Sequence, residues 1–449
     1  MNGMKVNYIS ECFIKPKYEV NESNQPHYLS PFDLMKLSSR YIQKGLLFSK
    51  PSQSTDHEPY STHEFLDRLK ESLSITLIHF YPLAGQLVTR LSEEKHESLI
   101  FVDCTKGPGV RFIYAKLDTT VSNITSPTDV PLVVESFFDH HKASNYDGHT
   151  RPLLSVQITE LHDGVFIGCS ANHAVLDGTS YWEFWNAWSE VHMSISKTVS
   201  SKSRLPIYGA SDPVCLPFIH RDEFISGVEP PQLRVKFFHF SSNSIKRLKS
   251  EANQQSDNNN NHLSSFQALS ALVWRSIIRS NKVCHDQVTN FRLTANDRHR
   301  LNPPLPREFF GNCVSLLTIT ATVGELLENS LGYAASLLHK SIVNHNDKSV
   351  NDFLKCWLQA PSVPKHGIMY DCNSVLISSS PRFDMYGNEF GLGKAIAVRS
   401  GYANKFQGTV IAYPGCEGGT SVDLEICLPP DVMSALELDV EFMDAVTSQ

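Results

Sequence analysis

Apolar residues recur at helical spacing in several stretches of the chain. Residues 61–80 and 179–192 each place their apolar side chains on one face of a helix. The stretch SSFQALSALVWRSIIRS predicts the clearest helix, because Ser264 can cap its first turn and Gln267 follows three residues later. A further helix is predicted over 324–346.

Strands are predicted between these helices. LLSVQITEL and GVFIGCSA, joined by HDG, predict a hairpin of two buried strands. Other short apolar segments predict strands at 5–16, 98–103, 110–115, 233–240, 374–378, 393–399, 409–413 and 421–427. Since strands and helices alternate in both parts of the chain, the expected fold class is mixed α/β.

The chain is long enough for two domains. Its 449 residues exceed the size at which one hydrophobic core usually stops growing. Residues 196–230 are rich in Ser, Lys and Pro and predict a linker. We therefore expect an N-terminal domain at 1–195 and a C-terminal domain at 231–449. The polar tract NQQSDNNNN, at 253–261, predicts a surface loop.

Composition excludes several classes of protein. A net charge of −7 without a basic run argues against a nucleic-acid partner. No stretch of 18 apolar residues predicts a membrane span. The ten cysteines form no CxxC pair, so we expect reduced thiols and no metal site. Because neither end of the sequence carries a recognisable targeting signal, the cytoplasm is the expected location.

The chemistry most worth testing lies in two HxxxD patterns. His63 and Asp67 belong to a predicted amphipathic helix, where this spacing makes them neighbours on a solvent-facing surface. His173 instead follows a predicted buried strand and precedes a predicted helix, a placement in which a rigid scaffold can aim a catalytic group. An imidazole can take and return a proton near neutral pH. It can equally be a polar side chain bound to a turn carbonyl, and the local sequence leaves both open.

Four segments together resemble a known family. They are YPLAGQL at 81–87, NHAVLDG at 172–178, PPLP…FGN at 303–312 and EFGLG at 389–393. In this order and spacing the chain resembles the BAHD family of plant acyl-CoA-dependent acyltransferases over essentially its whole length. The resemblance implies two chloramphenicol-acetyltransferase-like domains of related fold with a channel between them. It also implies that His173 is the general base.

The resemblance also implies the ligands. Acyl-CoA would be a co-substrate, with no bound cofactor and no metal. An aromatic or short aliphatic acyl group would pass to the hydroxyl or amine of a small plant specialised metabolite. No nucleic acid or membrane is expected as a partner, and a monomer is expected.

Supporting residues follow from the same resemblance. Asp177 would point away from the channel and pair with an arginine, which makes it structural. The second motif departs from the family pattern DFGWG, because Glu389 replaces the acid and Leu392 replaces the tryptophan. We expect Glu389 to pair with Arg298 or Arg300. The motif also supplies two turn glycines, Gly391 and Gly393.

Five further residues are candidates around the channel. Arg382 matches a position that binds an acceptor carboxylate in some family members; a brace or surface role is the competing hypothesis. Ser30 and Phe32 match a segment that lines the acceptor side. Ser264 and Ser265 begin a helix whose free N–H groups could bind CoA phosphates, although a plain helix cap explains them too.

Three functions remain open at this point. The leading hypothesis is acyl transfer from CoA. The second is a lyase or elimination reaction without CoA on the same scaffold, for example in phenolic or salicylate-type metabolism, which the altered EFGLG motif motivates. The third is a non-catalytic regulatory protein, which the intact HxxxD of His173 disfavours.

Overall fold

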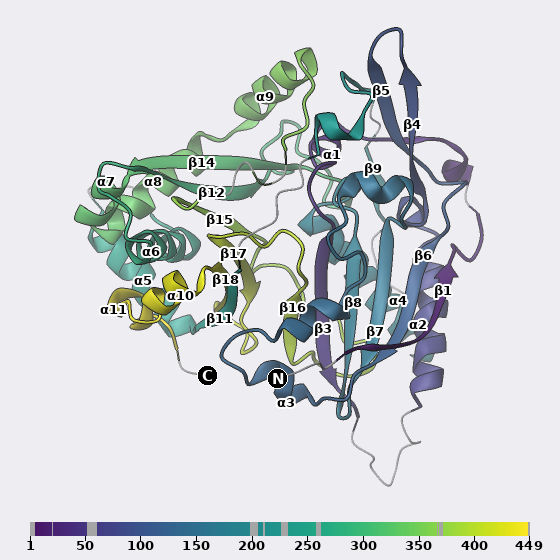
Figure 1. The fold of residues 1–449 in the computed structure, drawn as a ribbon, viewed down its shortest axis with the longest axis horizontal. Helices are drawn as coiled ribbons and strands as arrows, with labels where there is room; N and C mark the ends of the chain where they lie inside the picture. Colours follow the sequence, from purple (N-terminus) through teal and green to yellow (C-terminus); the bar gives the residue numbers. More distant parts are fainter. Residues whose placement is uncertain are drawn as a thin grey trace.

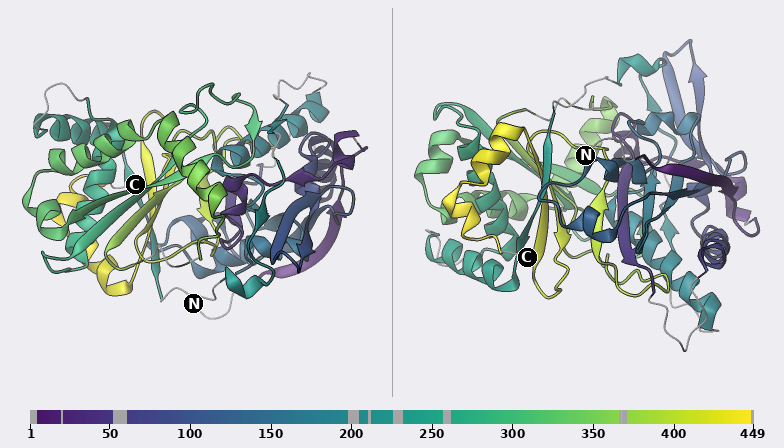
Figure 2. Two further views of the ribbon diagram at one scale, coloured as in Figure 1. Left: turned by 90° about the horizontal axis from the view of Figure 1, so that it is seen from above. Right: turned by 60° about the horizontal axis from the view of Figure 1, so that its bottom comes forward.

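Two six-stranded sheets, one in each half of the molecule, organise the part of the chain that the structure describes (Figure 1). The structure is a computed structural model. It describes residues 5–19, 21–51, 61–197, 205–209, 212–225, 232–256, 262–365, 367 and 371–447. Figure 2 shows the halves side by side, each with helices against its sheet. The mixed α/β fold class is confirmed.

The first sheet carries the predicted hairpin at its centre. Its strands in spatial order are β1 (Asn7–Ile14), β6 (Val110–Lys116), β7 (Leu154–Glu160), β8 (Gly164–Ala171), β3 (Ile42–Ser49) and β16 (Ala397–Ser400). Strands β7 and β8 pair antiparallel, and every residue of β8 is buried. Helices α2 (Thr62–Thr76) and α4 (Gly178–Lys197) pack against each other, and the Trp188 indole N–H donates to Ser72 Oγ at 3.0 Å.

The described residues of the predicted linker form short strands that pair with other parts of the chain. Within its described residues, β10 (Cys215–Leu216) pairs with β5 (Glu97–Asp103), which also pairs with β2 (His27–Tyr28) and β4 (Gln86–Ser92). Strand β9 (Ile207–Tyr208) pairs with β13 (Phe309–Phe310) of the second half. The described linker residues therefore pack against both halves, although their composition predicted a spacer.

The second sheet is covered by helices. Its strands in spatial order are β11 (Arg234–Phe240), β18 (Val422–Leu428), β17 (Thr409–Pro414), β15 (Ser374–Ser378), β12 (Val288–Asn296) and β14 (Val314–Thr322). The helices of this half are α5 (Ser242–Gln254), α6 (Ser265–Ser280), α7 (Val323–Glu328), α8 (Leu331–Asn344), α9 (Asp347–Gln359), α10 (Pro430–Leu436) and α11 (Val440–Met443). The predicted capping box of α6 is confirmed. The single helix predicted over 324–346 is wrong, because Asn329 is extended and Ser330 caps a new helix.

Strand β16 ties the two halves together. It comes from the C-terminal part of the chain, yet it pairs antiparallel with β3 of the first sheet, with Ala397 opposite Leu47 and Ser400 opposite Lys44. The division into domains at residue 231 stays a prediction. Strand β16 lies after this residue in the sequence but belongs to the sheet of the first half.

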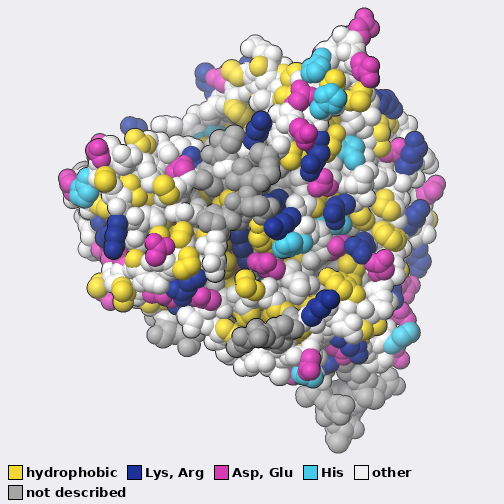
Figure 3. All heavy atoms as spheres, viewed as in Figure 1, with side chains coloured by type: hydrophobic (Ala, Val, Ile, Leu, Met, Phe, Trp, Pro, Cys, Tyr) yellow, Lys and Arg dark blue, Asp and Glu magenta, His cyan; other side chains and the backbone are white. Residues whose placement is uncertain are grey.

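Short segments complete the described chain. They are α1 (Pro31–Leu34), α3 (Val121–Thr125) and the 3-10 turns Asn21–Asn24, Tyr81–Ala84, Leu132–Phe137, Asn145–His149 and Arg221–Glu223. None of the helices in the described residues is both long and apolar enough to cross a membrane. On the face drawn in Figure 3, acidic and basic side chains are interspersed, and several lysine and arginine side chains lie near its middle.

Candidate active site

His173 lies at the carboxyl end of β8, in the turn that leads into α4. Its backbone N–H donates to Asn145 Oδ1 at 2.7 Å, and its carbonyl accepts from Asn312 Nδ2 at 2.7 Å. Its ring Nδ1 lies 2.9 Å from the carbonyl oxygen of Leu176. Three separate segments of the chain therefore fix both the backbone and the ring of this histidine.

The hydrogen bond to Leu176 determines the tautomer of His173. A carbonyl oxygen only accepts, so Nδ1 carries the proton and Nε2 keeps a lone pair. In the described structure Nε2 has no hydrogen-bond partner, and the residue is partly exposed. Burial, together with the Lys36 ammonium, lowers the pKa of His173 from 6.5 to about 4, against the opposing effect of the Asp177 carboxylate. The ring is therefore neutral at pH 7, and its Nε2 can accept a proton.

Asp177 is turned away from that ring and into the protein. Its side chain is 1% exposed and forms a two-pronged ion pair with Arg298, at 2.7 Å to Nη1 and 3.1 Å to Nη2. Three backbone N–H groups also donate to its carboxylate, from Thr179 (3.0 Å), Ser180 (3.1 Å) and Cys313 (3.0 Å). Asp177 therefore holds the start of α4 and does not orient the imidazole, whose Nδ1 is bound to Leu176.

Arg298 joins the two halves at this point. It follows β12 in the second half, and besides Asp177 it donates to Ser180 Oγ at 3.1 Å and to the Gly311 carbonyl at 2.9 Å. The pKa of Arg298 is raised because the effect of the Asp177 carboxylate outweighs that of burial. Arg298 therefore stays charged at neutral pH, and its bonds to Asp177, Ser180 and Gly311 fix the junction beside His173.

Asn145, Asn312 and Asp33 were missed by sequence reasoning. Asp33 Oδ1 accepts from the backbone N–H of Asn312 at 3.1 Å and from its side chain at 2.8 Å, which orients Asn312 towards His173. Burial raises the pKa of Asp33. Asn312 belongs to the FGN segment that carried part of the resemblance, so a signal for it existed. Asn145 lies in no motif, and a lone buried amide leaves no pattern in a single sequence.

The predicted ion pair of Glu389 is wrong. Its side chain is exposed, and Arg298 is already bound to the buried Asp177. Arg300 donates instead to the carbonyl of Ile342 at 3.0 Å. Burial decides the competition, because Asp177 offers a desolvated carboxylate with several donors fixed around it, whereas Glu389 faces water.

The EFGLG loop is held instead by its phenylalanine. Phe390 is fully buried, its ring lies 4.8 Å from that of Trp188 in α4, and its N–H donates to Ser189 Oγ at 3.4 Å. Gly391 and Gly393 have φ of +75° and +82°, values that favour glycine. The contact with α4 lies about 16 Å along the axis from the start of that helix. The loop braces α4 far from His173.

Leu392 and the two acceptor-side candidates have structural contacts. Leu392 is half-buried against the core of the first half. Ser30 caps α1, with its hydroxyl donating to Asp33 Oδ2 at 2.7 Å. Phe32 is buried beside Cys313 and packs with side chains of the second half. A role for Ser30 and Phe32 in binding the acceptor stays a prediction.

The remaining candidates, Ser264, Ser265 and Arg382, lie on other segments of the chain than the HxxxD turn. Ser264 accepts a backbone N–H as the cap of α6, and Ser265 is its first residue. The side chain of Arg382 is exposed and has no hydrogen-bond partner among the described residues. Its neighbour Phe383 reaches the start of α4, since a Cβ added at Gly178 would lie 3.4 Å from the Phe383 ring. Arg382 therefore lies one residue from a segment that contacts the HxxxD turn.

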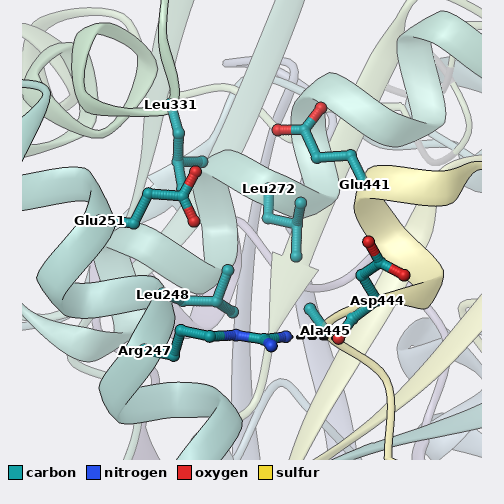
Figure 4. Close-up of a pocket in the computed structure, with 8 residues that line it drawn as sticks. All are labelled: Arg247, Leu248, Glu251, Leu272, Leu331, Glu441, Asp444 and Ala445. Carbon is teal, nitrogen blue, oxygen red and sulfur yellow. Dashed lines mark hydrogen bonds between the residues drawn. The ribbon is translucent and has the colours of Figure 1, made fainter.

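A small cavity among the helices of the second half lies apart from these residues (Figure 4). Its volume is about 280 Å³, and Figure 4 shows the Arg247 guanidinium directed towards the carbonyl of Asp444 across its floor. Its other acidic side chains are Glu251 and Glu441. No group of three or more His, Cys, Asp or Glu in the described residues could hold a metal ion.

Comparison with known proteins identifies the family. The model of the family described as "Transferase family" matches residues 4–443. The BAHD acyltransferase DCR of Arabidopsis thaliana is 32% identical over 98% of this chain and 93% of its own length. This chain belongs to the BAHD acyltransferase family. It is therefore an enzyme of the acyltransferase class.

Solved structures show the same fold. Vinorine synthase matches with a TM-score of 0.74 and 21% identity over 99% of both chains. TRI101 of F. sporotrichioides, in complex with coenzyme A and T-2, matches with a TM-score of 0.73 and 18% identity, over 94% of this chain and 99% of that one. The predicted two-domain, chloramphenicol-acetyltransferase-like fold of BAHD proteins is confirmed.

Proposed function

We propose that this BAHD protein transfers an acyl group from acyl-CoA to the hydroxyl or amine of a small plant specialised metabolite, with His173 as general base. One observation carries the proposal. The tautomer of His173 is fixed by the Leu176 carbonyl, which leaves a lone pair on Nε2 at a partly exposed position. Such a group can deprotonate a bound hydroxyl or amine if the reacting atom lies within hydrogen-bond reach.

The reaction follows from this geometry. Nε2 of His173 accepts the acceptor's proton as its oxygen or nitrogen attacks the thioester carbonyl. The tetrahedral intermediate then collapses, the carbon–sulfur bond breaks, and the proton on Nε2 passes to the leaving thiolate. Burial and the Lys36 ammonium, which lower the pKa of His173 to about 4, disfavour the imidazolium and so favour this second transfer.

The surrounding residues have defined parts in the proposal. Asp177, paired with Arg298, keeps the HxxxD turn at the start of α4, and the amides of Asn145 and Asn312 hold the backbone of His173. These four residues act by positioning His173. Gly391 and Gly393, with Phe390 between the motif's acid and first glycine, form the loop that braces α4.

The ligands are assigned by analogy and by chemistry. TRI101, which shares the fold, is known in complex with coenzyme A, so acyl-CoA is the proposed co-substrate and no bound cofactor is invoked. Ser264 and Ser265, at the start of α6, are proposed for the CoA phosphates. Arg382 is proposed to bind an acceptor carboxylate, and Ser30 and Phe32 to border the acceptor. A cytoplasmic monomer fits a CoA-dependent enzyme whose ten cysteines are all unpaired.

The test is acceptor-dependent release of CoA thiol by purified protein given a panel of acyl-CoAs and acceptors. With an active pair, His173→Ala should lower kcat by about 10²–10⁴-fold, the usual contribution of a general base. His63→Ala is the matched control, because His63 belongs to the other HxxxD pattern and its side chain is 88% exposed. An unchanged kcat in folded His173→Ala protein would remove His173 as the base. Acceptor turnover that needs no CoA would favour a lyase instead.

A further inference from the structure

A second and larger cavity lies where the two halves meet. Its volume is about 560 Å³. It is lined by residues of the segment 124–130, of β11 and of β16, and by Tyr386, Tyr413, Cys416, Asp423, Met443, Val446 and Thr447. Neither His173 nor the residues that hold it border this cavity. The volume is within the range of small-molecule sites, about 300–1,000 Å³.

Arg399 is the unusual residue in its wall. It is 9% exposed, and its guanidinium stacks over the ring of Phe237, with the central carbon 4.6 Å from the ring centroid. One N–H donates to the Val398 carbonyl at 2.9 Å, whereas the buried Nε has no hydrogen-bond partner in the described structure. None of the described carboxylates lies within ion-pair distance of it. Arg399 is therefore a buried cation without an ion pair among the described residues, and Glu425 and Asp423 act on it only through space.

The nearest acids are already bound. Glu425 accepts from Lys405 at 2.8 Å and from the hydroxyl of Tyr413 at 2.7 Å. Asp423 lies 2.6 Å from the ring of His239. Lys44 donates to the same Tyr413 hydroxyl at 2.7 Å, which adds a further buried cation behind the cavity wall. A buried cation without a paired anion is costly, which suggests that an anion is missing here.

We propose that this cavity is a binding site for a small carboxylate with an aromatic body, whose carboxylate pairs with Arg399. A guanidinium matches a carboxylate with two parallel hydrogen bonds. Arg399 is the cation of the wall without an ion pair, since Lys236 pairs with Glu437, and Asp423 also lines the cavity; a single negative charge is therefore favoured over a phosphate dianion. Phe237, Tyr386 and the apolar side chains of Ile396 and Val398 line the space beside it and suit an aromatic ring. The site is separate from that of the proposed acyl transfer.

The experiment titrates benzoate into the full-length protein by calorimetry, with neutral benzamide as the matched ligand. Benzoate should bind, benzamide should bind at least about tenfold more weakly, and Arg399→Met should weaken benzoate by at least about tenfold, as expected for loss of charged hydrogen bonds. Arg90→Met is the matched control, because Arg90 is an exposed arginine that lines neither cavity, and Arg382→Met tests whether benzoate binds at the acceptor position instead. Absence of benzoate binding, or its loss in Arg382→Met but not in Arg399→Met, would overturn the proposal.

Two further measurements separate binding from folding. Without ligand, Arg399→Met should melt at the same temperature or higher, since it removes a buried charge that has no ion pair; a lower melting temperature would show that Arg399 is structural and would overturn the site. Ile396→Trp keeps Arg399 and places a larger side chain at the cavity rim, where Ile396 is 36% exposed. This variant should also weaken benzoate by at least about tenfold. Unchanged affinity would show that benzoate binds elsewhere.

Discussion

Replacing Asp177 by alanine would remove the most heavily bonded carboxylate of the candidate site. The carboxylate accepts two hydrogen bonds from Arg298 and one each from the backbone N–H groups of Thr179, Ser180 and Cys313. Both ionic side chains are almost fully buried, at 1% and 2% exposure. Alanine would therefore leave a buried guanidinium with no carboxylate and three backbone N–H groups, two of them buried, without this acceptor.

The expected loss of stability follows from the number of contacts that the Asp177 carboxylate makes. Removing one partner of a buried ion pair costs about 3–5 kcal/mol, and loss of the cap at the start of α4 is included in that range because the same carboxylate makes both contacts. A typical domain has about 5–15 kcal/mol of stability in total. Asp177→Ala should therefore lower the free energy of unfolding by about 3–5 kcal/mol. The double variant Asp177→Leu, Arg298→Met should recover much of this, because it removes the stranded charge as well.

Urea denaturation measures the stability, and CoA thiol release measures activity on the same samples. The matched control is Asp67→Ala, the same change in the exposed HxxxD pattern, where the side chain is 55% exposed and the expected cost is about 0.5 kcal/mol or less. If Asp177 acts by positioning, stability and kcat should fall together. A fall in kcat of about 100-fold or more with no loss of stability would refute this reasoning and make Asp177 part of the proton transfer.

Three further outcomes are expected. Because the pKa of His173 is lowered to about 4 and only its neutral form is a base, kcat/KM should stay level from pH 7 down to about 5 and decline on approaching pH 4; a decline centred near pH 6.5 would contradict the lowered pKa. Lys36→Met removes a cation that lowers the pKa of His173, so the decline in kcat/KM should occur at higher pH in the same assay. A pH profile identical to that of the unmodified protein would show that Lys36 does not act on the ring. Leu392→Trp should change the melting temperature little, since Leu392 is half-exposed and the indole can extend into solvent, and a large loss of stability would show that the site is more tightly packed.

Local pattern was enough to predict the framework of the site. The hairpin β7–β8 and helix α4 were predicted from apolar spacing, and they place His173 between a buried strand and a helix. The separation of the two HxxxD patterns was also correct in structural terms, since His63 and Asp67 lie exposed 3.2 Å apart within α2. These features depend on residues close together in the chain, which is why one sequence reveals them.

Long-range pairing is what the sequence did not reveal. Strand β16 joins the sheet of the other half, and nothing in residues 397–400 records that their partner is β3. The same holds for Asn145, which reaches His173 from 28 positions away in the chain. Arg298 was expected, as one of two alternatives with Arg300, to pair with Glu389, and it pairs with Asp177 instead, because sequence spacing carries no information on which carboxylate is buried.

The departures in the EFGLG motif bear on the function less than the sequence suggested. A charged residue that faces water contributes little through ion pairing, and Glu389 is exposed. The part of the loop that makes buried contacts is Phe390, which matches the family pattern and packs on Trp188. Helix α4 begins directly after the HxxxD turn. A change at the Phe390–Trp188 contact can therefore affect the position of His173 only by moving α4 as a whole. The replacement of tryptophan by Leu392 therefore changes a partly exposed position of the brace and leaves the anchoring of His173 by Asn145, Asn312 and Leu176 unaltered.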